Sequence, residues 1–142
     1  MPVSFKEIID AFEFISVTAG YEHRAILCRK TGKIYTHSDF PDFEEFNDEL
    51  PDDVDDEENY IDIPDGYELD LGKPLVMDFA GYVLPSDFEE IRDIFGRRGA
   101  YQRFKALLAR RNALDRWYEY ESQATDKALR YWCSLNEIEL TD

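Results

Sequence analysis

Apolar residues near the start of the chain have the spacing of an amphipathic helix. They recur every three or four positions and so share one face, and the positions concerned are Phe5, Ile8, Ile9, Phe12 and Ile15. Ser4 and Glu7 stand three positions apart at the start of this run, which is the pattern of a capping box. The pattern predicts a helix over residues 4–16 with one buried face.

Three shorter stretches that follow are typical of β-strands. Residues 21–29 and 34–38 flank Lys30-Thr31-Gly32, which suits a type I turn with the glycine in the left-handed region. Residues 60–63 form the third stretch, which Pro64 ends. The sequence therefore predicts a β-hairpin and a third short strand.

The remainder of the chain returns to helical spacing. Four helices are predicted, over residues 71–84, 86–95, 101–111 and 115–135. Ser86 and Glu89 repeat the capping-box pattern. Asn112 suits the left-handed residue that closes a helix, and Asp115 suits the cap of the last helix.

The order of these elements predicts an α+β fold. Residues 1–70 supply the N-terminal helix and a small three-stranded antiparallel sheet, and residues 71–142 form a four-helix half packed on it. A chain of 142 residues is about the size of one domain, so a single domain over residues 1–142 is predicted. The proportions of hydrophobic residues (44%) and aromatic residues (15%) exclude a disordered chain.

Charge is distributed unevenly along the chain. The formal net charge is -16, and residues 39–70, here called the acidic segment, contain sixteen acidic residues and no basic one. This surplus argues against a protein whose whole surface attracts nucleic acid or an anionic membrane. The densest run of acids supplies the predicted partner-binding residues, which are Asp52, Asp53, Asp55, Asp56, Glu57 and Glu58. The run lacks the DxDxDG spacing of a calcium-binding loop.

A second charged region of opposite sign lies in the C-terminal half. Seven basic residues, here called the arginine cluster, face a single acid across residues 97–116: Arg97, Arg98, Arg103, Lys105, Arg110, Arg111 and Arg116. Arginine pairs in bidentate fashion with carboxylate or phosphate. Two targets fit the cluster. The arginines either pair internally with the acidic segment, or they bind an external anion such as a nucleic-acid backbone.

The cysteines and the first residues of the chain predict a cytoplasmic protein. Cys28 and Cys133 lie far apart and belong to no clustered motif, so both are predicted to be reduced, buried thiols. Charged residues within the first helical turns argue against a signal peptide. The most apolar stretch, residues 74–85, is too short to span a bilayer, and no membrane association is predicted.

A metal site on the hairpin is the most specific of the chemical hypotheses. A hairpin centred on Lys30-Thr31 places His37 opposite Ala25 and His23 opposite Asp39. His23 and His37 would then be diagonal neighbours on one sheet face, with Cβ atoms about 7–8 Å apart. Asp39 would supply a third ligand for zinc. The alternative is that both are ordinary surface or half-buried histidines, and a slip of one residue in the register removes the cluster.

Catalytic motifs are not found in the sequence. There is no GxSxG nucleophile elbow and no glycine-rich phosphate loop. The predicted hairpin also places Cys28 on the face opposite both histidines, so that no imidazole is near to activate the thiol. The sequence therefore predicts no catalytic residue, no cofactor and no bound metal, and His23, His37 and Asp39 are kept only as metal candidates.

Several blocks of the sequence, in a single order along nearly the whole chain, resemble the bacterial uncharacterised protein family 0158. The blocks are FKEIIDAFE at residues 5–13, RKTGKIY at 29–35, LPDD at 50–53, YIDIP at 60–64, RGAYQRF at 98–104 and DRWY at 115–118. Because that family is uncharacterised, the resemblance supplies no catalytic or cofactor-binding residue to carry over to this chain.

Two functions from different classes are consistent with these features. The first is a non-catalytic cytoplasmic interaction or regulatory protein that presents an acidic surface to a basic protein partner. The alternative is a nucleic-acid-associated module that uses the arginine cluster. Oligomeric state and the identity of the partner do not follow from the sequence.

Overall fold

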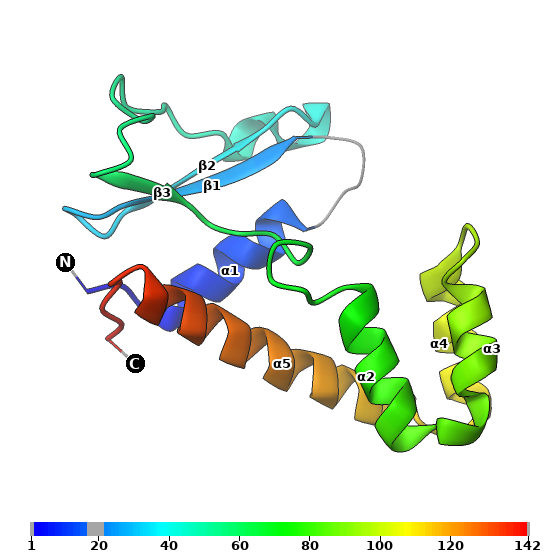
Figure 1. Ribbon diagram of the computed structural model, residues 1–142. Coiled ribbons are helices and arrows are strands. Elements are labelled where there is room, and N and C mark those ends of the chain that lie inside the picture. Colours follow the sequence, from blue (N-terminus) through cyan, green and yellow to red (C-terminus); the bar gives the residue numbers. More distant parts are fainter. Residues whose placement is uncertain (1, 17–21, 142) are drawn as a thin grey trace. The chain divides into compact units, whose positions relative to one another are not determined.

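The computed structural model describes residues 2–16 and 22–141 and confirms the α+β class (Figure 1). Residue 21, the predicted first position of the hairpin, lies outside the described residues. The elements follow in the order α1 (Phe5–Ile15), β1 (His23–Cys28), β2 (Ile34–Ser38), the short 3-10 helix η1 (Pro41–Phe46), β3 (Tyr60–Asp62), α2 (Lys73–Val83), the 3-10 turn η2 (Pro85–Asp87), α3 (Phe88–Ile94), α4 (Ala100–Arg110) and α5 (Leu114–Leu135).

The chain divides into two compact units. One, here called the sheet unit, consists of residues 1–65 and 128–142, and the other, the helical unit, consists of residues 66–127. The last turns of α5 thus belong with the sheet, whereas the sequence places all of residues 71–142 in the helical half. That the whole chain forms a single domain stays a prediction.

The sheet is antiparallel with the strand order β2-β1-β3. The predicted register of the hairpin is wrong by one residue, because Leu27 pairs with Ile34. The backbone N–H of Cys28 donates to the carbonyl of Lys33 at 2.8 Å, so the loop contains four residues rather than three. Gly32 has a φ of 76° and occupies the left-handed region, as predicted.

Helix α1 lies along one face of the sheet and buries the predicted apolar face, including Phe5 and Ile8 (Figure 1). The predicted capping box is wrong. The Ser4 side chain makes no cap hydrogen bond, and only its carbonyl accepts hydrogen bonds, from the backbone N–H groups of Glu7 and Ile8. The box predicted at Ser86 is also wrong, because a 3-10 turn intervenes and Asp87 takes the cap position of α3.

The two chain ends meet beside α1 in the sheet unit. Val3 and Leu140 form an isolated parallel bridge, in which the Val3 N–H donates to Glu139 and the Thr141 N–H donates to Val3, both at 2.9 Å. The Arg130 guanidinium lies 3.9 Å from the centre of the Phe5 ring. These contacts attach the C-terminal residues to the start of α1.

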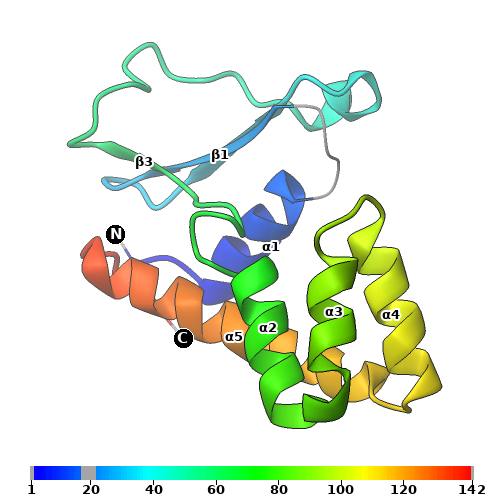
Figure 2. The ribbon, with the colours of Figure 1, turned by 45° about the vertical axis from the view of Figure 1, so that its right-hand side comes forward.

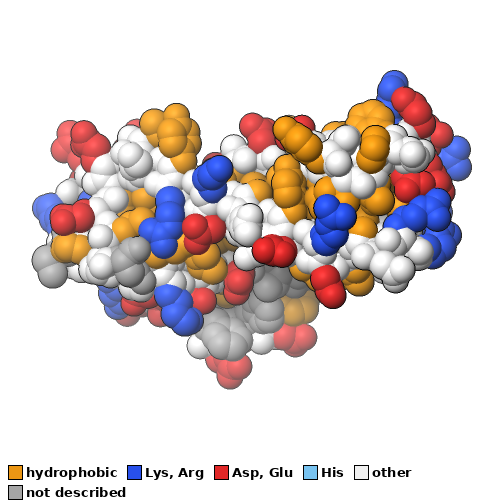
Figure 3. Space-filling model, turned by 90° about the horizontal axis from the view of Figure 1, so that it is seen from below, with side chains coloured by type: hydrophobic (Ala, Val, Ile, Leu, Met, Phe, Trp, Pro, Cys, Tyr) orange, Lys and Arg blue, Asp and Glu red, His pale blue; other side chains and the backbone are white. Residues whose placement is uncertain are grey.

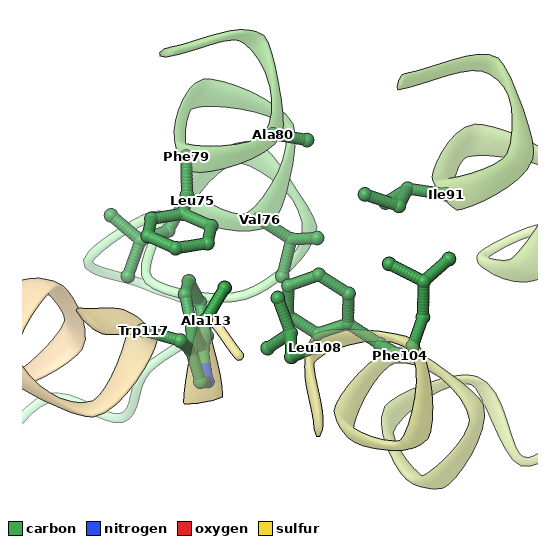
Figure 4. Close-up of a cluster of buried hydrophobic side chains, with 10 residues drawn as sticks. Leu75, Val76, Phe79, Ala80, Ile91, Phe104, Leu108, Ala113 and Trp117 are labelled. Atoms are coloured by element: carbon green, nitrogen blue, oxygen red, sulfur yellow. The ribbon is translucent and has the colours of Figure 1, made fainter. Parts of the chain in front are cut away.

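The helical unit has its own hydrophobic core. Helices α2, α3 and α4 lie side by side, and the start of α5 completes the cluster (Figures 2 and 4). Trp117 is fully buried, with its ring centre 5.2 Å from that of Phe79 and 5.1 Å from that of Phe104. Asn112 closes α4 with a φ of 55°, as predicted, but α5 begins at Leu114, so Asp115 lies in the first turn and is not the cap.

Among the helices of the described residues, none combines the length and the apolar character needed to cross a membrane.

Candidate functional site

The first part of the acidic segment is hydrogen-bonded to the edge of the sheet. Strand β2 is an edge strand, and the backbone groups of Thr36 and Ser38 point away from β1. The Asn47 side chain accepts a hydrogen bond from the Ser38 N–H at 2.7 Å and donates to the Ser38 carbonyl at 3.1 Å. Asp48 also makes two hydrogen bonds to Thr36. Its carboxylate accepts from the Thr36 backbone N–H, and its own backbone N–H donates to the Thr36 carbonyl, both at 2.9 Å. These two residues cover an edge that would otherwise be open to pairing.

Residues 51–59, here called the acidic turn, form an ordered turn held by two of the predicted partner-binding residues. Asp56 accepts hydrogen bonds from the Glu58 N–H at 3.0 Å and from the Asn59 amide at 2.6 Å. Asp53 accepts one from the Tyr60 hydroxyl at 2.9 Å, and this hydrogen bond raises the pKa of Tyr60 to about 12. Asp53 and Asp56 therefore shape the turn.

The other four predicted partner-binding residues are exposed on the acidic turn, and they are Asp52, Asp55, Glu57 and Glu58. Within the described part of the sheet unit, none of the four forms an ion pair. The neighbouring Arg24–Asp62 pair, at 3.1 Å, lies outside the turn. The structure thus places four uncompensated carboxylates on a backbone that has a defined shape.

The arginine cluster lies on α4 and at its two ends in the helical unit. Figure 3 shows Lys and Arg side chains gathering at its right-hand edge, the side on which Figure 1 places α3 and α4. Arg111 makes two hydrogen bonds to the buried Asp87, both at 3.0 Å, and Arg110 lies 3.9 Å from Glu90. Two members of the cluster therefore have acidic partners within the helical unit. Pairing with the acidic segment stays a prediction.

The remaining arginines are exposed, and within residues 66–127 they form no ion pair; they are Arg97, Arg98, Arg103 and Arg116. Lys105 lies over the ring of Tyr118, 5.6 Å from its centre. The cluster thus contains a paired part at Arg110 and Arg111 and an unpaired end formed by Arg97, Arg98 and Arg103, at the turn before α4 and along that helix. Within the same residues, Arg116, in the first turn of α5, is unpaired as well.

The Asp87–Arg111 pair predicts a dependence of stability on pH. The hydrogen bond from Arg111 lowers the pKa of Asp87 in the folded protein. A carboxyl whose pKa is lowered by folding contributes stability above its unfolded pKa of about 4, and this contribution is lost as the pH falls through the folded value. We expect Asp87→Asn to lower Tm at neutral pH and this difference to shrink below about pH 4.

Thermal unfolding monitored by circular dichroism across this pH range measures the effect. Glu90→Gln is the matched control, since Glu90 is exposed and lies 3.9 Å from its arginine, and it should change Tm little. A Tm difference for Asp87→Asn that is constant with pH would contradict a charge-based contribution.

The three metal candidates of the hairpin are not brought together, because the register differs by one residue. His23 pairs with Ser38 and His37 pairs with Arg24, so the two imidazoles lie on opposite faces of the sheet. His23 Nδ1 is 2.7 Å from the Ser38 hydroxyl, and Asp39 is exposed beyond the strand. Across residues 2–16 and 22–141, no three His, Cys, Asp or Glu side chains are grouped to hold a metal ion.

Both cysteines are buried and unbonded to one another, as predicted. Burial raises the pKa of Cys133 to about 11, which makes its thiol unreactive. Burial also opposes ionisation of Cys28, but hydrogen bonds from Thr31 and from the backbone at Lys30 lower the pKa of its thiol overall. Cys28 shares its sheet face with His37 in the observed register, so the predicted separation of these two residues onto opposite faces is wrong.

Sequence reasoning missed the residues that organise both charged regions. Asn47 and Asp48 stand in the acidic segment without any motif that marks them as edge-covering residues. Asp87 lies 24 residues from Arg111, and no local spacing connects the two. Only the three-dimensional fold brings these groups together.

The fold and its surfaces define a small α+β protein with an ordered acidic turn on the sheet unit and an arginine cluster on the helical unit. Comparison of the chain with family models, with curated proteins and with solved structures finds no match. The resemblance to the uncharacterised family 0158 stays a prediction.

Proposed function

We propose that this protein is a non-catalytic, cytoplasmic interaction or regulatory protein whose acidic segment binds a basic protein partner. The observation that carries the proposal is the acidic turn, in which Asp53 and Asp56 shape the backbone and four other carboxylates are exposed. An ordered charged surface binds with a smaller loss of conformational entropy than a flexible one. Complementary charge also speeds the encounter with a basic partner.

Placement in the cytoplasm is supported by the two buried cysteines, which are not joined in a disulfide. The cytoplasm is therefore the compartment in which we propose that the basic partner is found.

The proposal predicts that neutralising the exposed acids of the turn weakens binding to a labelled oligolysine peptide. The variant combines Asp52→Asn, Asp55→Asn, Glu57→Gln and Glu58→Gln and leaves Asp53 and Asp56 intact. Exposed charge pairs contribute about 0.2–1 kcal/mol each, so we expect Kd to rise about tenfold at low salt. Fluorescence anisotropy measures Kd.

A matched variant carries the same number of neutralised acids in the helical unit: Asp78→Asn, Asp93→Asn, Asp115→Asn and Glu119→Gln. It changes the net charge equally and is expected to raise Kd much less. Equal losses in the two variants would mean that oligolysine responds only to net charge, and the acidic turn would not be a binding surface.

A second candidate, a nucleic-acid-associated module, is favoured by the unpaired end of the arginine cluster. Arg97, Arg98 and Arg103 are exposed at the turn before α4 and along that helix. Binding of a labelled single-stranded RNA that weakens steeply with salt, and is lost on changing these three arginines to glutamine, would support this function over the first.

A further inference from the structure

A groove of about 430 Å³ lies between α1 and the β2 side of the hairpin, within the sheet unit. Helix α1 contributes Glu7, Asp10, Ala11 and Phe14, strand β2 contributes Ile34 and Thr36, and the hairpin loop before β2 contributes Gly32 and Lys33. None of the residues lining the groove comes from β1, so it runs along the outer, edge strand of the sheet.

The groove has an apolar base of fixed geometry. Ala11 is buried, and Phe14 and Ile34 are half-buried beside it. The Phe14 ring packs edge-on against His23, with the ring centres 5.8 Å apart. A base of this kind suits one apolar side chain of a ligand.

The rim of the groove is acidic. Glu7 and Asp10 are exposed on the α1 side; Asp10 forms an ion pair with Lys6 at 2.9 Å, so Glu7 is the acidic residue of the rim for which the described part of the sheet unit shows no ion pair. Lys33 also lines the groove, but its ammonium lies over the Tyr35 ring, 4.7 Å from the ring centre, and Tyr35 is on the sheet face opposite Ile34 and Thr36. The groove therefore carries one basic lining residue whose charge is directed toward the other face of the sheet.

The acidic segment is hydrogen-bonded to a residue that lines the same groove. Thr36, which lines it, donates its backbone N–H to the carboxylate of Asp48 at 2.9 Å. The groove and the acidic segment are thus neighbouring parts of one negatively charged surface on the sheet unit.

Backbone groups of the edge strand are also open beside the groove. Hydrogen-bonded pairs alternate along the hairpin, and because Cys28 bonds to Lys33, the backbone groups of Ile34 point away from β1. The acidic segment covers the corresponding groups of Thr36 and Ser38, whereas no residue described here bonds to those of Ile34. An extended peptide could bond to Ile34 while its side chain enters the groove.

We propose that this groove binds an extended segment of the basic partner, with one apolar side chain on Ala11, Phe14 and Ile34 and flanking lysine or arginine side chains at Glu7 and Asp10. The inference rests on the proposed function and deepens it. The acidic turn supplies attraction for any basic segment, and the groove adds selection for an apolar residue within that segment.

The test compares two labelled peptides that differ at one position, an oligolysine with a central leucine and the same peptide with a central serine. The leucine peptide is expected to bind the unaltered protein about five- to tenfold more tightly, because burial of part of its side chain is favourable. Ile34→Thr keeps a β-branched residue in the strand and should abolish this advantage while leaving the affinity for the serine peptide unchanged. Tyr35→Thr, at the next position on the opposite face, should preserve the advantage.

Equal affinity for the two peptides, or an advantage that survives Ile34→Thr, would overturn the inference. If Ile34→Thr does not fold, NMR titrations of the unaltered protein test the inference instead. The leucine peptide should change the chemical shifts of Ala11 and Thr36, and the serine peptide should not. Sedimentation tests a further alternative. If the unaltered protein self-associates and Ile34→Thr abolishes this self-association, the groove binds a second copy of the chain, and the inference is overturned as well.

The same peptides separate this inference from the proposed function. The variant with four neutralised acids in the turn should weaken both peptides and keep the ratio between them. Failure of both peptides to bind would reject the proposed function, whereas binding of both without a leucine advantage would reject only the role of the groove.

Discussion

Replacing Trp117 with alanine is expected to lower the free energy of unfolding by about 3–5 kcal/mol. Trp117 is fully buried and touches the rings of Phe79 and Phe104 edge-on (Figure 4). Truncation leaves a cavity between α2, α4 and α5 that the surrounding helices cannot fill without moving. Urea unfolding monitored by circular dichroism measures the loss.

Two control variants separate volume from chemistry. Trp117→Phe should cost less than the alanine change, because the buried Nε1 has no hydrogen-bond partner among the described residues and its removal leaves no new unsatisfied group. Tyr118→Ala changes the exposed neighbour and should alter stability by less than about 1 kcal/mol. A similar loss for Tyr118→Ala and Trp117→Ala would contradict the central place of Trp117 in this core.

The second large effect is expected at Asn47, whose side chain covers the edge of the sheet. Asn47→Ala leaves both backbone groups of the buried Ser38 without these partners, and we expect a loss of about 1–3 kcal/mol. The start of the acidic segment should also detach from β2. Hydrogen exchange should therefore become faster at Ser38 and across residues 47–59.

Glu44→Ala is the matched control, because Glu44 is an exposed residue of the preceding η1 helix. It should change neither stability nor exchange appreciably. If Asn47→Ala leaves exchange at Ser38 unchanged, the side chain of Asn47 is not what closes this edge.

The α-helices and β-strands of the fold could be predicted because each depends on local pattern, whereas the 3-10 segments η1 and η2 are not predicted. The spacing of Phe5 and Ile8 predicts α1, and the left-handed positions at Gly32 and Asn112 follow from residue type. The hairpin register could not be predicted, since three-residue and four-residue loops fit the same Lys-Thr-Gly sequence. That single residue of difference moves His37 to the other face of the sheet and separates it from the other metal candidates.

The candidate site could be predicted only at the level of charge. The run of acids is plain in the sequence, but the different roles of Asp53 and Asp56 depend on hydrogen bonds to Tyr60 and Asn59. The groove beside Ile34 depends on how α1 packs on β2, and no pattern in either segment alone indicates it.

The most direct test of the central claim is a titration of isotope-labelled protein with oligolysine, followed by two-dimensional NMR. If the acidic turn is the binding surface, the shift changes should concentrate in residues 51–59 and saturate together, and they should fade as salt is added. Shift changes spread over the acids of both units, or absent from residues 51–59, would contradict the account.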